Sequence, residues 1–265
     1  MAARGFMDLK DVLYDVRDHI ATVTLNRPDR LNALGGSLGP DLEAALKQAR
    51  SDDDVRVIVL TGAGKAFCSG LDLKERSEHP KVRTVANWLR GLETPRIALG
   101  MNKPMIAAVN GAAVGFGFEL AMLCDYRIGS EDARMGDAHV KRGLVQDCAA
   151  VYTLPRVTGW ANACKVLLTG ELFPAAELKD LGVLNEVVPS GQALAAATTF
   201  AQRIACNAPL AVQMTKRLML MAERGQLDDV VDYSFLLMGM MQQTEDSVEG
   251  IKSFLEKRQP QFKGK

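Results

Sequence analysis

The alternation of apolar and polar positions predicts strands in the first part of the chain. Residues 12–25 alternate apolar residues with threonines and stop before Pro28, which is typical of a hairpin. Leucines and alanines at helical spacing predict a helix over residues 37–50. Mostly apolar runs at 55–60 and 104–109, each followed closely by glycine, predict buried strands. Strands that end in glycine turns and lead into helices indicate an α/β layered domain.

The pattern changes near Ala193, after which strand signals disappear. Three successive amphipathic segments, 193–209, 210–225 and 227–258, predict helices to the end of the chain. The methionine-rich stretch Leu236–Met241 is expected to lie in the core or in a subunit contact, because methionine fills irregular apolar gaps.

Composition and charge exclude several classes of protein. Lysine plus arginine and aspartate plus glutamate number 32 each, so no net field attracts nucleic acid or an anionic membrane. The five cysteines are odd in number and lack metal-ligand spacing, which disfavours a disulfide framework and a zinc site. No signal peptide is evident and no apolar run approaches the roughly 18 residues of a membrane span. The sequence therefore predicts a cytoplasmic protein without a metal, nucleic-acid or membrane partner.

Two glycine-containing loops and one carboxylate carry the first chemical signal. Residues 61–66 lack the spacing of a phosphate loop, and 115–117 lack the third glycine of a dinucleotide fingerprint. Each loop nevertheless leaves an apolar strand and exposes peptide N–H groups, and two such donors can form an oxyanion hole. Glu119 follows the second loop inside an apolar helical pattern over 117–123. A carboxylate there is costly to keep charged, which favours an acid/base role, although an ion pair with Arg127 is an alternative.

Four ordered segments give the sequence a family resemblance. They are LNRPDRLNAL, TGAGKAFCSGLDL, KPMIAAVNGAAVGFGFELAMLCD and EGIKSFLEKRQPQFKGK. Together they resemble the crotonase (enoyl-CoA hydratase/isomerase) superfamily from about residue 12 to 263. The resemblance implies a spiral of β-β-α turns with an acyl-CoA site in residues 1–195. It also implies a helical trimerisation region in 196–265, assembly as a trimer or a dimer of trimers, and no cofactor besides the CoA of the substrate.

The resemblance also implies binding residues. The oxyanion donors are the backbone N–H groups of Leu71 and Phe116, and the second place is usually glycine in the family. The segment 77–96, which includes Trp88, matches the loop that shapes the acyl pocket. The implied CoA contacts are Arg30 and Leu31 along the CoA, with Phe254 and Lys257 at the adenine end of a neighbouring subunit's CoA.

The catalytic positions depart from an ordinary hydratase. Glu119 matches the first hydratase glutamate, which activates water, but His139 stands where the second glutamate is expected. Asp147 occupies a place that is glycine in ordinary hydratases and aspartate in resembling dienoyl-CoA and epoxide-type phenylacetyl-CoA isomerases and chlorobenzoyl-CoA dehalogenases. His139 as a surface residue, Asp147 as the N-cap of the following helix and Cys148 as a thiol nucleophile are the alternatives.

These residues predict an acyl-CoA enzyme that stabilises a thioester enolate and hydrates a 2-enoyl-CoA. In this reaction Glu119 activates water, and His139 and Asp147 complete the proton transfer. Double-bond isomerisation of an enoyl- or dienoyl-CoA is the close alternative, favoured by Asp147. Hydrolysis of a CoA thioester or a C–C bond, and acyl-CoA binding without catalysis, are further alternatives.

Overall fold

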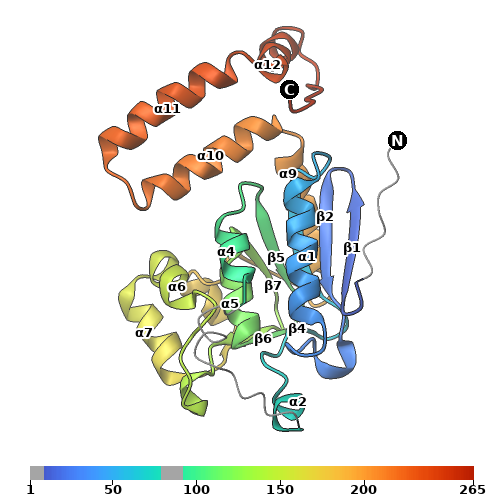
Figure 1. The fold of residues 1–265 in the computed structure, drawn as a ribbon, viewed down its shortest axis with the longest axis vertical. Helices are drawn as coiled ribbons and strands as arrows, with labels where there is room; N and C mark the ends of the chain where they lie inside the picture. The colour runs from blue at the N-terminus through green and yellow to red at the C-terminus, as the bar shows by residue number, and fades with distance from the viewer. Residues whose placement is uncertain (1–8, 79–91) are drawn as a thin grey trace.

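Two β-sheets form the centre of the protein in a computed structural model that describes residues 9–78 and 92–265 (Figure 1). The larger sheet has the order β1-β2-β3-β5-β7-β10, with β1 antiparallel to β2 and the other pairs parallel. The smaller sheet has the order β4-β6-β8-β9. The strands of the first sheet are β1 (Val12–Arg17), β2 (Ile20–Leu25), β3 (Val57–Gly62), β5 (Met105–Val109), β7 (Tyr126–Ser130) and β10 (Glu186–Val188). Those of the second are β4 (Ala66–Cys68), β6 (Ala112–Val114), β8 (Arg134–Gly136) and β9 (Phe173–Pro174).

Successive strands alternate between the two sheets. β3, β5 and β7 enter the larger sheet, and each is followed by a short strand, β4, β6 or β8, in the smaller one. Because the three pairs are stacked in parallel, the loops after β4, β6 and β8 gather at one side of the molecule. This arrangement confirms the predicted β-β-α spiral. It places the loop after β4 (residues 69–72) beside the second predicted glycine loop, 115–117, whereas the first predicted glycine loop, 61–66, is the connection between β3 and β4.

Both faces of the larger sheet are covered by helices. Ile58 and Leu60 of β3 pack in one apolar cluster with α1 (Leu38–Ser51), whereas Val57 and Val59 face a second cluster with α9 (Ala193–Ala205). The strands of a parallel sheet that is buried on both faces are expected to be nearly continuous apolar runs. β3 and β5 show this pattern. The remaining elements of this part are η1 (Pro28–Arg30), α2 (Leu73–Glu78), α4 (Thr94–Leu99), α5 (Phe116–Met122), η2 (Val140–Arg142), α6 (Ala150–Thr158), α7 (Trp160–Thr169) and α8 (Ala175–Asp180).

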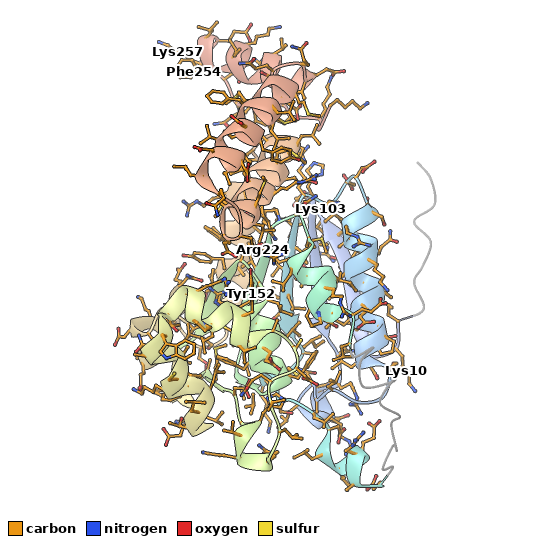
Figure 2. All side chains as sticks on the ribbon, turned by 60° about the vertical axis from the view of Figure 1, so that its left-hand side comes forward. Lys10, Lys103, Tyr152, Arg224, Phe254 and Lys257 are labelled. Atoms are coloured by element: carbon orange, nitrogen blue, oxygen red, sulfur yellow. The ribbon has the colours of Figure 1, made fainter. Side chains whose placement is uncertain are left out.

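The last three helices extend away from the sheets (Figure 1). They are α10 (Pro209–Ala222), α11 (Leu227–Met241) and α12 (Glu245–Leu255). The end of α10 is tied back to α6, because Arg224 Nε donates to the Tyr152 hydroxyl at 3.0 Å (Figure 2). Within the predicted methionine-rich stretch of α11, Leu237 is buried, but Leu236 and Met238 are 59% exposed. The predicted boundary at residue 195 falls inside α9, which packs on the sheet.

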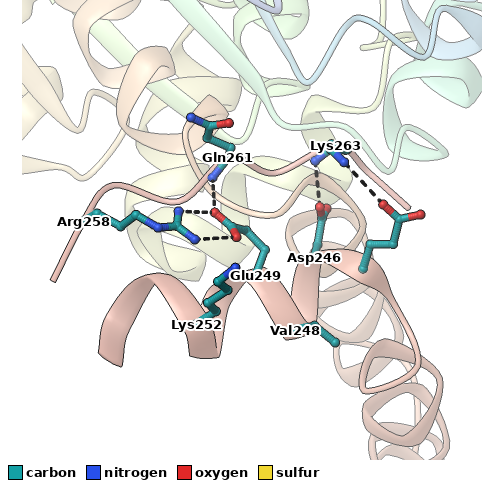
Figure 3. Close-up of a pocket in the computed structure, with 8 residues that line it drawn as sticks. Asp246, Val248, Glu249, Lys252, Arg258, Gln261 and Lys263 are labelled. Atoms are coloured by element: carbon teal, nitrogen blue, oxygen red, sulfur yellow. Dashed lines mark hydrogen bonds and ion pairs between the residues drawn. The ribbon is translucent and has the colours of Figure 1, made fainter. Parts of the chain in front are cut away.

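The C-terminal tail folds back on α12 (Figure 3). Glu249 pairs with the Arg258 guanidinium and accepts the Gln261 N–H, and Asp246 accepts the Lys263 N–H at 2.7 Å. The pocket between α12 and the tail is lined by these ion-paired residues. It therefore belongs to the anchoring of the tail and lies far from the glycine loops.

The elements predicted from hydrophobic periodicity are confirmed for the hairpin, α1, β3, β5, α5 and the first two C-terminal helices. The third predicted C-terminal segment, 227–258, is divided into α11 and α12 by a break at residues 242–244. The smaller sheet was not predicted, because strands of two or three residues are too short to show periodicity. Trp88 and most of the predicted acyl-pocket loop lie outside the described residues. Among the described residues, no helix has both the length and the apolar character needed to cross a membrane.

Candidate active site

The loop after β4 (residues 69–72) and the loop after β6 (residues 115–117) meet because glycine allows their backbones to approach closely. Gly70 has a φ of +95°, and a Cβ there would lie 2.8 Å from the carbonyl oxygen of Val114. A Cβ on Gly117 would lie 2.1 Å from the carbonyl oxygen of Cys68, so α5 can sit on β4 only with glycine at this position. The loop after β4 and the loop after β6 are therefore held side by side at the start of α5.

The two predicted oxyanion donors lie on these loops. Phe116 is the first residue of α5, so its N–H has no intrahelical acceptor. In the loop after β4, the Leu34 N–H donates to the Gly70 carbonyl oxygen and the Asp72 N–H donates to the Leu34 carbonyl oxygen. The Leu71 N–H takes no part in these two hydrogen bonds.

Phenylalanine is compatible with the position that is usually glycine in the family. The left-handed conformation falls on Gly115, with a φ of +54°, and Phe116 is not among the residues with positive φ. The Phe116 side chain is buried in the apolar core.

Glu119 lies one turn further along α5 and is fully buried. Its Oε1 accepts the backbone N–H groups of Cys148 and Ala150, each at 3.0 Å, and its Oε2 has no partner among the described residues. Ala149, between the two donors, has a φ of 75°, a conformation that costs an alanine about 1 kcal/mol or more. Burial raises the pKa of Glu119 to about 7, the two N–H bonds oppose this, and the charge of Asp137 adds to it.

The structure contradicts two alternative roles. The Arg127 guanidinium does not pair with Glu119 but donates to the carbonyl oxygens of Val183 and Cys124, at 2.7 and 2.6 Å. Asp147 is not the N-cap of α6, since the cap residue is Ala149 and Glu119 accepts the first N–H of the helix. The N-cap alternative fails because a carboxylate distant in sequence, that of Glu119, occupies the position that a local side chain would take.

His139 lies beside Glu119 and is held by Asp137. Asp137, fully buried after β8, accepts the His139 backbone N–H at 3.1 Å, and its Oδ1 lies 2.5 Å from His139 Nδ1. The His139 side chain is 15% exposed, which contradicts the surface-residue alternative. The bond to Asp137 raises the pKa of His139, burial opposes the increase, and Glu119 and Asp147 add to it.

Glu119, Asp137 and His139 form a compact cluster, with one possible ligand atom from each lying within 4.8 Å of the others. One imidazole and two carboxylates are suitable ligands for a divalent cation. Metal–ligand bonds of about 2.1 Å place neighbouring ligand atoms about 3 Å apart. The 2.5 Å between Nδ1 and Oδ1 is shorter than this, so the two groups contact each other directly through a hydrogen bond. We therefore interpret the cluster as a proton-transfer group, and the expected absence of a metal stays a prediction.

Asp147 and Cys148 flank the cluster. Asp147 is exposed on the loop before α6, and its negative charge acts on His139. The Cys148 thiol is fully buried, and burial raises its pKa far above neutrality. A protonated, buried thiol is a poor nucleophile, so the structure does not favour the Cys148 alternative.

The predicted CoA residues fall in two places. The Ser69 N–H donates to the Leu31 carbonyl oxygen at 3.0 Å, so Arg30 and Leu31 lie against the loop after β4. Both residues are exposed. Phe254, 82% exposed, and Lys257 lie at the far end of the C-terminal helices (Figure 2). Within one chain the structure does not bring the two pairs together.

Sequence reasoning missed Asp137. The available signal was an acidic residue two positions before His139 and directly after Gly136. Aspartate side chains bond backbone and side-chain groups two residues on, so the spacing pointed to a local pair.

Comparisons with known proteins identify the family of the chain. A family model described as enoyl-CoA hydratase/isomerase matches residues 15–265. The (E)-benzylidenesuccinyl-CoA hydratase of Thauera aromatica is 41% identical over 254 residues, which cover 96% of this chain and 99% of that protein. The 1,2-epoxyphenylacetyl-CoA isomerase of Escherichia coli (strain K12) is 34% identical, covering 96% of this chain and 98% of that protein. The crystal structure of an enoyl-CoA hydratase from Bacillus anthracis superposes with a TM-score of 0.89 at 30% identity, covering 97% of this chain and 100% of that one. This chain therefore belongs to the enoyl-CoA hydratase/isomerase family, the crotonase superfamily, and is an enzyme of acyl-CoA thioesters.

Proposed function

We propose that this enzyme hydrates a 2-enoyl-CoA, with Glu119 and His139 as its acid/base pair. The observation that carries the proposal is the buried Glu119 carboxylate, oriented by two backbone N–H groups and placed next to His139. A pKa of about 7 lets Glu119 exchange a proton near neutral pH, which is the range in which a general base is most effective.

The first step is polarisation of the thioester. The N–H groups of Leu71 and Phe116 bind the carbonyl oxygen of the substrate, and the negative charge that develops on this oxygen strengthens both bonds. Loss of one such donor typically costs about 3 to 4 kcal/mol of transition-state stabilisation. Polarisation makes the β-carbon of the conjugated double bond electrophilic.

The second step adds water. The Glu119 carboxylate accepts a proton from water as the water oxygen bonds to the β-carbon, which leaves an enolate held by the two N–H groups. The His139 imidazolium donates its proton to the α-carbon, and the thioester carbonyl re-forms. Glu119 has gained one proton and His139 has lost one, and transfer between the two neighbouring groups restores the starting state.

Isomerisation is a second candidate function. Asp147 lies on the loop that joins the site to α6, and the Escherichia coli relative named as an isomerase is 34% identical. In this reaction Glu119 or Asp147 would remove and return a carbon-bound proton, and no water would be consumed.

Incubation with crotonyl-CoA in oxygen-18 water distinguishes the candidates. Hydration predicts loss of the conjugated enoyl-thioester absorbance, a product containing solvent oxygen and no free CoA thiol. Release of free CoA would instead indicate hydrolysis. No reaction with crotonyl-CoA, benzylidenesuccinyl-CoA or longer 2-enoyl-CoAs, together with conversion of 3-enoyl- or dienoyl-CoA, would replace the hydratase proposal by the isomerase one. Tight binding without turnover of any of them would leave an acyl-CoA binder.

We also propose that the C-terminal helices form the subunit contact of a trimer or a dimer of trimers. Large apolar side chains are exposed along them in the single chain, including Phe235 at 72% and Leu255 at 73%. Such a contact would carry Phe254 and Lys257 towards the CoA of a neighbouring subunit. Analytical ultracentrifugation tests the assembly, and a monomer at micromolar concentration would contradict it. Balanced charge and free cysteines support a cytoplasmic location, which fractionation of the source cells would test.

A further inference from the structure

A third residue, Asp137, lies against the acid/base pair, and the family resemblance did not imply it. Asp137 is fully buried, yet a buried carboxylate is costly unless its oxygens are bonded. Its Oδ1 meets two groups of a single residue, the backbone N–H and the Nδ1 of His139. Its Oδ2 has no partner among the described residues. Among the described residues, both hydrogen bonds of this carboxylate are therefore made to one residue, His139, one to its backbone and one to its imidazole.

The backbone holds Asp137 rigidly in this place. The preceding residue, Gly136, accepts the Gly115 N–H at 3.0 Å, and a Cβ on Gly136 would lie 2.0 Å from the carbonyl oxygen of Glu171. The His139 ring in turn packs against Gly115, with Cε1 at 3.6 Å from the position a Cβ would occupy. Asp137, His139 and the loop of the second oxyanion donor are thus one connected unit.

The bond to Nδ1 determines the chemistry of the other ring nitrogen. When Nδ1 carries the proton shared with Asp137, Nε2 is the nitrogen that is free to give or accept a proton. The second glutamate of an ordinary hydratase needs no such partner, because a carboxyl group has no tautomers to select. A histidine in its place needs one.

We propose that Asp137 is a positioning residue that fixes the His139 tautomer and presents Nε2 to the substrate, so that an Asp–His pair performs the task of the missing glutamate. The inference rests on the proposed acid/base role of His139. Three carboxylates act on this imidazole: Asp137 beside it, Glu119 on α5 and Asp147 on the loop before α6. Of the two cations on the adjoining η2, Lys141 and Arg142, the Arg142 guanidinium donates to the Ala138 carbonyl oxygen.

The test uses Asp137→Asn and two measurements. The first is the pH dependence of modification of His139 by diethylpyrocarbonate, which attacks the neutral imidazole, followed by mass spectrometry of the peptide that contains His139. Loss of the carboxylate should lower the midpoint by about one pH unit or more. The second is the pH profile of crotonyl-CoA hydration, in which kcat should fall about 10²- to 10⁴-fold with little change in KM, and the alkaline limb should move to lower pH.

Asp41→Asn is the matched control. Asp41, like Asp137, is a carboxylate that accepts backbone N–H groups, here those of Lys10 and Asp11. It is only partly buried and lies on α1. It should leave both measurements unchanged. An equal change in the control would show a general effect of removing a charge and overturn the proposal.

The two measurements separate this inference from the proposed function. If the wild-type protein hydrates crotonyl-CoA but Asp137→Asn shifts neither the modification midpoint nor the alkaline limb, the role of Asp137 is refuted and the function stands. If no enoyl-CoA is hydrated, the modification midpoint still tests the pair. Should Asp137→Asn fail to fold, the wild-type protein suffices, because a His139 midpoint at or below the ordinary 6.5 would overturn the proposal.

Discussion

Replacement of Glu119 by glutamine should separate its catalytic role from its structural one. Glutamine keeps the length of the side chain and an acceptor oxygen for the N–H groups of Cys148 and Ala150. It cannot ionise, so the variant removes a buried negative charge while the link between α5 and α6 remains. We expect a folded protein in which kcat is lower by about 10² to 10⁴.

The effect on stability follows from the pKa of Glu119. Burial raises this pKa from 4.5 to about 7, so between these pH values the folded protein binds more protons than the unfolded chain. The free energy of unfolding then falls as pH rises through this window. At about 1.4 kcal/mol for each pKa unit, the total loss is about 3 kcal/mol, and Glu119→Gln should not show it. His139, whose pKa is raised above 6.5, adds a loss of the same sign above that pH in the wild-type protein.

Urea unfolding at pH 5 and pH 8, at one protein concentration, measures this difference. We take the free energy of unfolding of Glu119→Gln minus that of the wild-type protein at each pH. This difference should be about 2 to 3 kcal/mol more favourable to the variant at pH 8 than at pH 5. Glu43→Gln is the control, because Glu43 also accepts two backbone N–H groups, at the start of α4, but is only half-buried. Glu43→Gln should show neither the relative gain in the free energy of unfolding nor the decrease in kcat. A Glu119→Gln protein that is less stable relative to the wild-type protein at pH 8 than at pH 5 would refute the reasoning. Unchanged turnover would remove Glu119 from the mechanism.

Three further substitutions test the site and its frame. Asp147→Ala should leave the melting temperature unchanged, because Asp147 does not cap α6, and a decrease measured by calorimetry would restore the capping role. Gly117→Ala should lower the free energy of unfolding by about 2 kcal/mol or more, because its Cβ would lie 2.1 Å from the Cys68 carbonyl oxygen. Its control, Gly239→Ala, meets no atom within 4 Å in α11 and should gain up to about 1 kcal/mol in denaturant unfolding. Cys148→Ala should retain most of the wild-type kcat, since the thiol is buried and protonated, and abolished turnover in the enoyl-CoA assay would contradict this.

The sequence by itself determined the elements whose signals are local. The hairpin, β3, β5 and α1 follow from periodicity, and the family resemblance placed Glu119 and His139 at the positions of an acid/base pair. The glycines of the second loop, 115–117, also predicted a close approach of backbone, which the contact at Gly117 now specifies, whereas Gly70 lies outside the first predicted loop, 61–66. Local propensity and motif spacing act over a few residues, so they can be read without the fold.

Only the tertiary structure decided what surrounds Glu119. Two N–H groups about 30 residues further along the chain bond its carboxylate, and Arg127, within reach in sequence, instead bonds backbone carbonyls. The partner of a buried charge is chosen by burial and geometry, because each desolvated group must be satisfied by whichever donor the packing brings near.

The same reason explains why Asp137 was missed and why Asp147 was given the wrong structural alternative. Both are aspartates at the ends of short segments, and their spacing to His139 and to α6 looks equally suggestive in the sequence. Burial separates them: Asp137 is enclosed and directed at an imidazole, whereas Asp147 is exposed and the position it would have capped is occupied by Glu119. Burial is a property of the assembled chain, since it depends on residues that become neighbours only when the fold forms.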